Sequence, residues 1–227
     1  MPPDSSLIAR ILSSECKDLG FPITEDDIHA FTVLSAELKK WNSRINLTAI
    51  TDDREITVKH FVDSLHLATL ITGEDRLLDI GSGAGFPIIP LKIARPATSM
   101  MSVDCVAKKI NFQRHIIRSL ELNGIDAIHA RVEDIAKTYE RSFTVIVSRA
   151  FTRLDHFVEL AAPLLAADGR LIAMKGADVE DEITASGAVL SALGFTVTMT
   201  YRYSLPYCMG ERTLTVLKPC QAALNKG

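Results

Sequence analysis

The chain has 227 residues, 47% of them hydrophobic and 23% charged, which is ordinary globular composition and suits one large α/β domain or one domain with an appended piece. With 25 Lys and Arg against 28 Asp and Glu, the net charge is −3. This balance excludes a generalised polycation, so any contact with nucleic acid must come from a local basic patch.

The first 72 residues are predicted to be all helical. Apolar residues recur on one face of the first helix, and Gly20 ends it. Thr24 and Asp52 are each followed three residues later by an acidic residue, which is the spacing of a capping box. They therefore start the second and third helices. The expected helices span 5–19, 24–44 and 52–70.

After residue 72, short β-rich runs alternate with helical stretches. This alternation predicts a mostly parallel sheet with helices on both faces. Only the turn-rich "SLPYCMGE" separates the last two runs, so we expect them to pair antiparallel. The expected strands span 76–81, 98–104, 126–132, 143–148, 169–176, 195–203 and 212–218, with helices near 107–123, 152–166 and 178–193. The predicted units are a helical region packed on the core (1–72), a sheet domain (73–219) and a C-terminal tail (220–227).

The stretch "LLDIGSGAGFPIIPLKIARP" follows the pattern of a ligand-binding loop. Gly81, Gly83 and Gly85 come directly after an apolar strand, and Pro87 and Pro90 fit the first turn of a following helix. Glycine admits backbone angles closed to other residues and lets a ligand approach the main chain. Dinucleotide folds prefer G-x-G-x-x-G, whereas G-x-G-x-G favours S-adenosylmethionine (SAM). Taken alone, the motif is a weak signal, because many such glycine turns are only tight loops.

Two acidic residues follow the next two strands. Asp104 ends the second strand, near the ~20-residue interval from the glycines at which a ribose-binding carboxylate is expected. Glu133, with Val132 before it, follows the third strand and could flank an adenine ring. The alternatives are a solvated strand end for Asp104 and a helix-capping role for Glu133. All these positions fall at successive strand ends of one crevice, where nucleotide-like ligands bind in open parallel sheets.

Cysteine usage and the N-terminal sequence indicate the compartment. Cys16, Cys105, Cys208 and Cys220 lie far apart, without the spacing of a zinc ribbon or a disulfide framework. The start of the chain lacks the basic and apolar regions of a signal peptide. No apolar run approaches the ~20 residues of a membrane span. We expect a reduced cytoplasmic protein with no metal site.

Several motifs occur together in a characteristic order along nearly the whole chain. They are "WNSRINLTAI" (41–50), "HFVDSL" (60–65), "LDIGSGAGFPIIPL", "SRAF" (148–151), "KG" (175–176) and "GERTLTVLK" (210–218). On these motifs the chain resembles the bacterial 16S rRNA guanine-N7 methyltransferase family, also called the glucose-inhibited division protein B family. The resemblance implies a Rossmann-like, seven-stranded SAM-dependent methyltransferase sheet, mostly parallel with its last strand antiparallel, and an N-terminal helical extension.

The resemblance also implies which residues contact SAM: the Gly81 backbone, Phe86, the Val132–Glu133 pair and Arg149. Two positions depart from the family pattern, because Ile88 stands where glycine is usual and Thr213 where histidine is frequent. Combined with the residue-by-residue argument, the expected cofactor-binding residues are Gly81, Gly83, Phe86, Asp104, Val132, Glu133 and Arg149.

The family reaction suits these side chains. Guanine N7 carries a lone pair and no proton, so its methylation needs alignment and a shaped electrostatic site rather than a general base. We therefore name no catalytic acid or base. Arg149 stays protonated and cannot be a base, but its guanidinium can hold a carboxylate or phosphate in a bidentate grip. An ordinary surface ion pair is the alternative role for Arg149.

Folded RNA would be recognised by small basic clusters, with the target base turned out for methyl transfer. Lys109 and Arg114 belong to one such cluster, and Lys175 could hold an RNA phosphate, although surface lysines are as often only solvated. Trp41 could stack on a base, but filling the seam between the helical region and the sheet domain is the more common role. The expected partners are 16S rRNA or the 30S particle, with no membrane and no obligate protein partner.

Other functions stay possible on sequence grounds. A nicotinamide-dependent dehydrogenase would need the longer glycine spacing. A cytosine-C5 methyltransferase needs a cysteine nucleophile; "KPCQ" holds Cys220 after a proline, but in the tail of the last strand rather than at a central strand end. The chain could also methylate another RNA base or a small molecule, or be a non-catalytic RNA-binding assembly factor.

Overall fold

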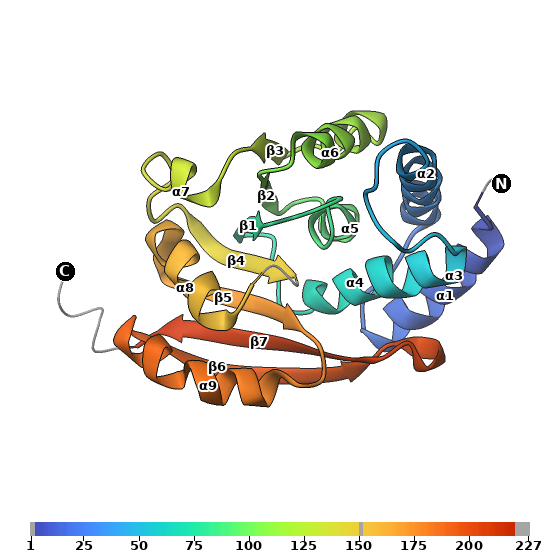
Figure 1. Ribbon diagram of the computed structural model, residues 1–227. Coiled ribbons are helices and arrows are strands. Elements are labelled where there is room, and N and C mark those ends of the chain that lie inside the picture. The colour runs from blue at the N-terminus through green and yellow to red at the C-terminus, as the bar shows by residue number, and fades with distance from the viewer. Residues whose placement is uncertain (1–2, 150–151, 221–227) are drawn as a thin grey trace.

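The computed structural model describes residues 3–149 and 152–220, and within them one seven-stranded sheet (Figure 1). The strands are β1 (Arg76–Ile80), β2 (Ser99–Asp104), β3 (Ile125–His129), β4 (Phe143–Arg149), β5 (Leu165–Lys175), β6 (Phe195–Ser204) and β7 (Glu211–Pro219). Their order is β3-β2-β1-β4-β5-β7-β6. β7 runs antiparallel to both neighbours, and the other pairs are parallel. The predicted sheet is therefore confirmed.

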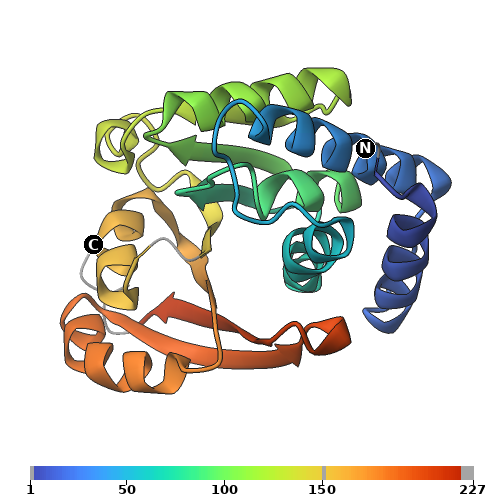
Figure 2. The same ribbon diagram turned by 45° about the vertical axis from the view of Figure 1, so that its right-hand side comes forward.

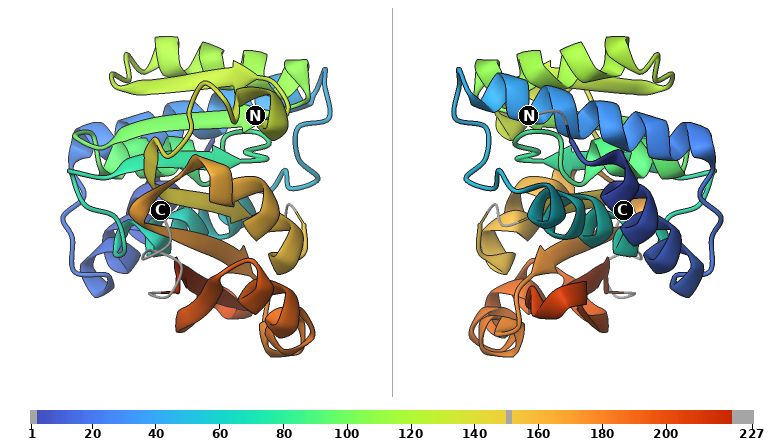
Figure 3. Two further views of the ribbon diagram at one scale, coloured as in Figure 1. Left: turned by 90° about the vertical axis from the view of Figure 1, so that its left-hand side faces the viewer. Right: turned by 90° about the vertical axis from the view of Figure 1, so that its right-hand side faces the viewer.

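Helices cover both faces of the sheet (Figures 2 and 3). On one face lie α4, α5 and α6, with α1, α2 and α3 outside them, and on the other lie α7, α8 and α9. The α-helices are α1 (Ser5–Asp18), α2 (Glu25–Asn42), α3 (Asp53–Ile56), α4 (Asp63–Ala68), α5 (Ile88–Ala94), α6 (Ala107–Ser119), α7 (Val132–Ile135), α8 (Leu154–Ala161) and α9 (Val179–Ala192). A π-helix, η1 (Thr57–Val62), joins α3 to α4, and two 3-10 helices are η2 (Ala162–Leu164) and η3 (Pro206–Cys208).

The core has two layers because successive strand residues point to opposite faces. Leu77 of β1 packs with the N-terminal helices, α5 and α6, whereas Leu78 packs with α7, α8 and α9. Apolar residues of the N-terminal helices belong to the same buried cluster as Leu77. Trp41 fills the seam, as predicted, with its ring centroid 5.6 Å from that of Phe112 and 5.1 Å from that of His115, both on α6.

Helix starts follow the predicted signals. Thr24 and Asp27 form a reciprocal capping box at α2, and the Asp52 side chain accepts a hydrogen bond from the Glu55 amide at α3. Pro90 lies in the first turn of α5, as the prolines after the glycines predicted.

Four predicted boundaries are wrong. The helix predicted near 107–123 ends at Ser119. β3 ends at His129 rather than at 132, because Arg131 becomes the N-cap of α7 and Val132 its first residue. The helix predicted to reach 166 ends at Ala161, and β5 begins at Leu165, earlier than the predicted 169. Pro163 lies between them in η2 and lacks the N–H that a continuing α-helix needs. The predicted tail falls outside the described residues, except for Cys220.

Lys92 is a buried lysine of α5, only 2% exposed. Its Nζ donates to the carbonyl oxygens of Pro96 at 2.9 Å, Thr98 at 2.6 Å and Gly124 at 3.2 Å. These bonds fasten the end of α5 to the turns that precede β2 and β3. Burial lowers the pKa of Lys92.

We expect Lys92→Met to destabilise the protein by about 2–4 kcal/mol, because three carbonyls lose their donor. For a chain of this size that corresponds to a melting temperature lower by roughly 5–15 °C, measured by calorimetry. Lys17→Met, at an exposed lysine of α1, is the control and should change the melting temperature little. Equal melting temperatures of the two variants would contradict a structural role for Lys92.

Candidate active site

A cavity of about 910 Å³ lies at the carboxyl edge of the parallel strands. Its wall combines the glycine loop (residues 81–85), the segments that follow β2 and β3, the ends of β4 and β5, and part of the N-terminal extension (residues 1–72). Small-molecule sites are typically ~300–1,000 Å³. This cavity is at the large end of that range and has room for more than one small ligand group.

The glycine loop has two kinds of glycine. Gly81, Gly83 and Gly85 all have positive φ, at 69°, 58° and 86°. A Cβ on Gly83 would have no atom within 4 Å, so this residue faces open space. A Cβ on Gly85 would lie 2.9 Å from Ile89 Cγ1 and 3.2 Å from Gln113 Cγ. Gly85 is thus required for packing, whereas Gly81 and Gly83 line the cavity.

Asp104 holds the glycine loop in place. One carboxylate oxygen accepts a hydrogen bond from the Gly83 amide at 2.9 Å, and the other accepts from the Val106 amide at 2.8 Å. The residue is 7% exposed and lines the cavity. Because each carboxylate oxygen has a second acceptor position, Asp104 can also accept from ligand hydroxyls.

Gln113 of α6 holds the glycine loop through hydrogen bonds. Sequence reasoning did not identify this residue. Its Nε2 donates to Ser82 Oγ at 2.7 Å and to the Gly83 carbonyl at 2.8 Å, while its Oε1 accepts from Ser102 Oγ at 2.6 Å. Gln113 is fully buried. An amide on the apolar face of a predicted helix was the only available signal.

Val132 and Glu133 begin α7 and both line the cavity, Val132 buried and Glu133 exposed. Lys109 also lies at the cavity. Arg114, predicted to act with Lys109, lies elsewhere. Its Nε donates to the Ala127 carbonyl at 2.9 Å, and it lines a separate groove beside β3.

Lys175 lies at the cavity but is engaged within the protein. Its Nζ donates to the Thr152 carbonyl at 2.6 Å and forms an ion pair with Glu182 of α9 at 2.8 Å. Neither predicted role, a phosphate contact or a solvated surface lysine, included this pairing. The predicted motif at 148–151 is described only at Ser148 and Arg149, since 150 and 151 fall outside the described residues.

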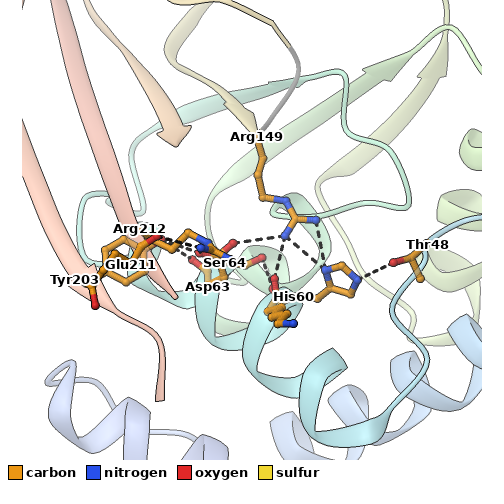
Figure 4. A network of polar contacts seen from close by, with 9 residues as sticks. Thr48, His60, Asp63, Ser64, Arg149, Tyr203, Glu211 and Arg212 are labelled. Atoms are coloured by element: carbon orange, nitrogen blue, oxygen red, sulfur yellow. Dashed lines mark hydrogen bonds and ion pairs between the residues drawn. The ribbon is translucent and has the colours of Figure 1, made fainter. Parts of the chain in front are cut away.

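Arg149 ends β4 and is held by the N-terminal extension (Figure 4). Its Nη1 donates to the Lys59 carbonyl at 3.0 Å and lies 3.4 Å from Asp63 Oδ2. Both terminal nitrogens are 3.4 Å from His60 Nδ1. The guanidinium carbon is 5.6 Å from the centroid of the Phe86 ring. Arg149 thus joins the sheet, the glycine loop and the extension at one point of the cavity wall.

Two of these partners, Lys59 and His60, lie on η1, and Asp63 follows it directly. A π-helix has i→i+5 hydrogen bonds, and such segments occur frequently at functional sites. Asp63 is 4% exposed; its Oδ1 accepts from the Tyr203 hydroxyl at 2.7 Å and lies 3.7 Å from Arg212 Nε. One carboxylate is thereby shared by arginines of β4 and β7. Sequence reasoning assigned no role to Asp63 or Arg212.

His60 lies between Arg149 and the loop that follows α2. Its ring stacks on Phe86, with centroids 4.4 Å apart and planes 8° apart. Its Nε2 is 3.0 Å from Thr48 Oγ1. Burial, and secondly the charge of Arg149, lowers the pKa of His60 to about 3. The imidazole is therefore neutral at physiological pH.

Asp79 of β1 is fully buried beneath the glycine loop, and neither of its carboxylate oxygens has a hydrogen-bond partner among the described residues. The Ile88 amide approaches it without adequate hydrogen-bond geometry. Burial is the main cause that raises the pKa of Asp79 to about 7; Arg149 opposes this rise and Asp104 adds to it.

This raised pKa predicts a pH-dependent stability. The native state keeps a proton that the unfolded chain releases near pH 4, so the stabilisation is complete below that pH and is lost as pH rises to about 7. We expect the melting temperature of the wild type to fall by a few degrees more than that of Asp79→Asn between pH 5 and pH 8. If the melting temperatures of the wild type and of Asp79→Asn change with pH by the same amount, Asp79 does not titrate in this range.

Cys220, the possible nucleophile of a cytosine-C5 enzyme, lies far from the cavity. It follows β7, whose last residue pairs with Phe195, the first residue of β6. That places Cys220 at the opposite edge of the sheet, where its amide donates to the Gly194 carbonyl.

Among the described residues no helix is long and apolar enough to cross a membrane.

Comparisons with known proteins agree with this architecture. A sequence profile for GidB, rRNA small subunit methyltransferase G, matches residues 27–209. Ribosomal RNA small subunit methyltransferase G of Geobacter sulfurreducens is 47% identical over 211 residues, covering 93% of this chain and 97% of that protein. The Streptococcus suis protein of the same name is 39% identical over 217 residues, covering 92% and 90%.

Solved structures share the fold at low identity. TYW2 of M. jannaschii in complex with AdoMet has a TM-score of 0.58 and 13% identity, covering 77% of each chain. A SAM-dependent methyltransferase from Aquifex aeolicus has a TM-score of 0.52 and 15% identity, covering 71% of this chain and 92% of that one. Both have the same α/β architecture.

Proposed function

The chain belongs to the rRNA small subunit methyltransferase G family, and from this premise we propose that it methylates N7 of one guanosine in the decoding-region loop of 16S rRNA. It is a SAM-dependent rRNA methyltransferase. The observation that best supports the proposal is the cavity at the carboxyl edge of β1, framed by the open main chain of the glycine loop and by Arg149.

The residues of one half of this cavity suit SAM. The open space at Gly83 leaves the main chain free for close approach of a nucleoside. Asp104 has acceptor positions left for ribose hydroxyls, and Val132 with Glu133 can flank the adenine. Arg149 offers only donors and a permanent charge, which suits the carboxylate of the methionine part. When bound, SAM supplies a methyl group on a positively charged sulfur.

The chain's own residues provide alignment rather than proton transfer. His60 is neutral, but one of its nitrogens faces Arg149 and the other faces Thr48. Asp63 is occupied by Tyr203 and two arginines. Guanine N7 attacks with its own lone pair, so such a site needs to fix distance and angle; correct positioning can supply about 7–11 kcal/mol at best.

The mouth of the cavity favours a polyanionic substrate. Two cationic side chains that line it, Lys109 and Arg131, form no ion pair among the described residues and would neutralise phosphates near the target base. Lys59, Lys175 and Arg212 also line the cavity, but each is paired with a carboxylate of the protein. We propose rRNA in the 30S particle as the substrate and the cytoplasm as the place of action.

The test is to incubate the purified protein with tritiated SAM and 30S particles that lack this methyl group. We expect about one methyl group per particle, located by chemical cleavage at 7-methylguanosine. Naked 16S rRNA in a parallel reaction distinguishes free RNA from the particle as substrate. Methylation of another atom or base would overturn the proposal, and intact SAM binding without any transfer would indicate a non-catalytic RNA-binding factor.

A further inference from the structure

The cavity has two halves on either side of β1. Toward β2 and β3 lie Asp104 and the Val132–Glu133 pair, which suit the nucleoside of the cofactor. Toward β5 lie Lys175 and the N-terminal extension, and Arg149 at the end of β4, proposed above to hold the SAM carboxylate, stands between the two halves. The acceptor base therefore has the second half available, and the extension contributes its wall.

Two parts of the extension form that wall: η1, and the loop of residues 43–52 between α2 and α3. Leu47, Thr48 and Ile50 of this loop line the cavity. Asn42 fixes the loop, because its Oδ1 accepts from the amides of Leu47 at 2.7 Å and Thr48 at 3.0 Å, while its Nδ2 donates to the Thr48 carbonyl at 2.9 Å. The position of Thr48 is thus set by two hydrogen bonds to the Asn42 side chain, and that of its neighbour Leu47 by a third.

The direction of the hydrogen bond between His60 and Thr48 is set by Arg149 (Figure 4). A guanidinium can only donate, and both terminal nitrogens of Arg149 face His60 Nδ1 at 3.4 Å, so we assign the lone pair to Nδ1. A neutral imidazole then has its proton on Nε2. That proton is donated to Thr48 Oγ1 at 3.0 Å.

Thr48 Oγ1 also accepts from the Ile50 amide at 3.1 Å. A hydroxyl has two acceptor positions and one proton, so both acceptor positions are filled. Among residues 3–149 and 152–220 no group accepts the Thr48 proton. The hydroxyl at the cavity wall can therefore act toward a ligand only as a donor.

We propose that Thr48 is a specificity-determining residue whose hydroxyl donates a hydrogen bond to O6 of the target guanine. This rests on the proposed function. Guanine presents N7 and O6 as adjacent acceptors on one edge, whereas adenine presents N7 beside an amino donor. With Thr48 fixed as a donor, its hydroxyl can bind O6 of guanine and leave N7 free to react. With adenine, the same hydroxyl would face the N6 amino group, which is also a donor. His60 and Arg149 act here as positioning residues, because they fix the direction of the Thr48 proton.

The test is a cycle of two enzymes and two substrates. Thr48→Val removes the hydroxyl, and 2-aminopurine at the target nucleotide of ligated 16S rRNA, assembled into 30S particles, removes O6 but keeps N7. We expect either change alone to lower kcat/KM by roughly 10–100-fold, and the second change to cost almost nothing once the first is made. Thr48→Ser keeps the hydroxyl and should keep the full sensitivity to loss of O6.

The cycle remains informative even if Thr48→Val disturbs the loop of residues 43–52. Thr48→Val also leaves the His60 and Ile50 donors without an acceptor, but this loss affects both substrates equally and cancels in the cycle. Affinity for SAM, measured by calorimetry, should stay close to wild type. Multiplicative losses, or an unchanged rate of Thr48→Val on guanosine, would overturn the inference. If the wild type does not methylate N7 of guanosine, the proposed function itself is wrong.

Discussion

Replacing Gly83 with leucine is expected to weaken SAM binding at least ~100-fold, which corresponds to about 2.8 kcal/mol. Gly83 has a φ of 58°, and a side chain built on it would enter the open cavity rather than touch the protein. A leucine would therefore occupy the volume in which the nucleoside must approach the main chain. The measurement is calorimetric titration of the purified variant with SAM.

Gly20 provides a matched control for this experiment. It also has a positive φ, 77°, and a Cβ there would likewise meet no atom within 4 Å. Both substitutions place an ordinary side chain in a left-handed conformation, at a cost of about 1–2 kcal/mol. Gly20→Leu should therefore lose similar stability while binding SAM normally. If Gly83→Leu binds SAM as the wild type does, the cofactor site is elsewhere.

Arg149→Met is expected to lower kcat/KM for methyl transfer by roughly 100–1,000-fold, or about 3–4 kcal/mol. Methionine keeps much of the side-chain length but removes the charge and every donor. The variant would lose the bond to the Lys59 carbonyl, the donor that fixes the His60 ring and the proposed contact with the carboxylate of SAM. The measurement is tritiated methyl transfer to 30S particles under single-turnover conditions.

Arg170 is the control, because its environment is similar and its position is remote. It donates to the Leu70 carbonyl at 2.7 Å and to both carboxylate oxygens of Asp75, at 3.2 and 2.8 Å. These groups lie at the edge of the sheet opposite the cavity. Arg170→Met should lower the melting temperature without reducing transfer in the molecules that remain folded. Equal losses of activity in the two variants would show that Arg149 acts through stability alone.

The sequence was most informative about the central sheet. β1 and β4 are rich in apolar residues because parallel strands are buried on both faces. The glycines after β1 predicted the position of the cavity. The end of β3 was mistaken because "DAIHARV" keeps a strand-like pattern through Val132. The helix N-cap at Arg131 has no side-chain signal, since its side chain makes no capping hydrogen bond.

The partners of Arg149 could not be derived in the same way. The bond from Arg149 to Lys59 joins residues 90 positions apart, and no local pattern encodes such a pairing. The same holds for Asp63, which receives arginines from two different strands. Lys175 was expected to face RNA, but its pairing with Glu182 depends on how α9 packs beside β5. Residue type at a strand end predicts the chemistry available there, and tertiary packing decides how it is used.

The π-helix has a consequence for how this enzyme family can diversify. Each residue of an α-helix turns the chain by about 100°. Loss of a single residue between 57 and 62 would therefore rotate the preceding residues of the helix about its axis relative to α4. The apolar composition would survive almost intact, while a different set of side chains would face the part of the cavity proposed for the acceptor base. A change of chain length at this point could therefore redirect the choice of nucleotide and leave the methyl-donor half of the cavity untouched.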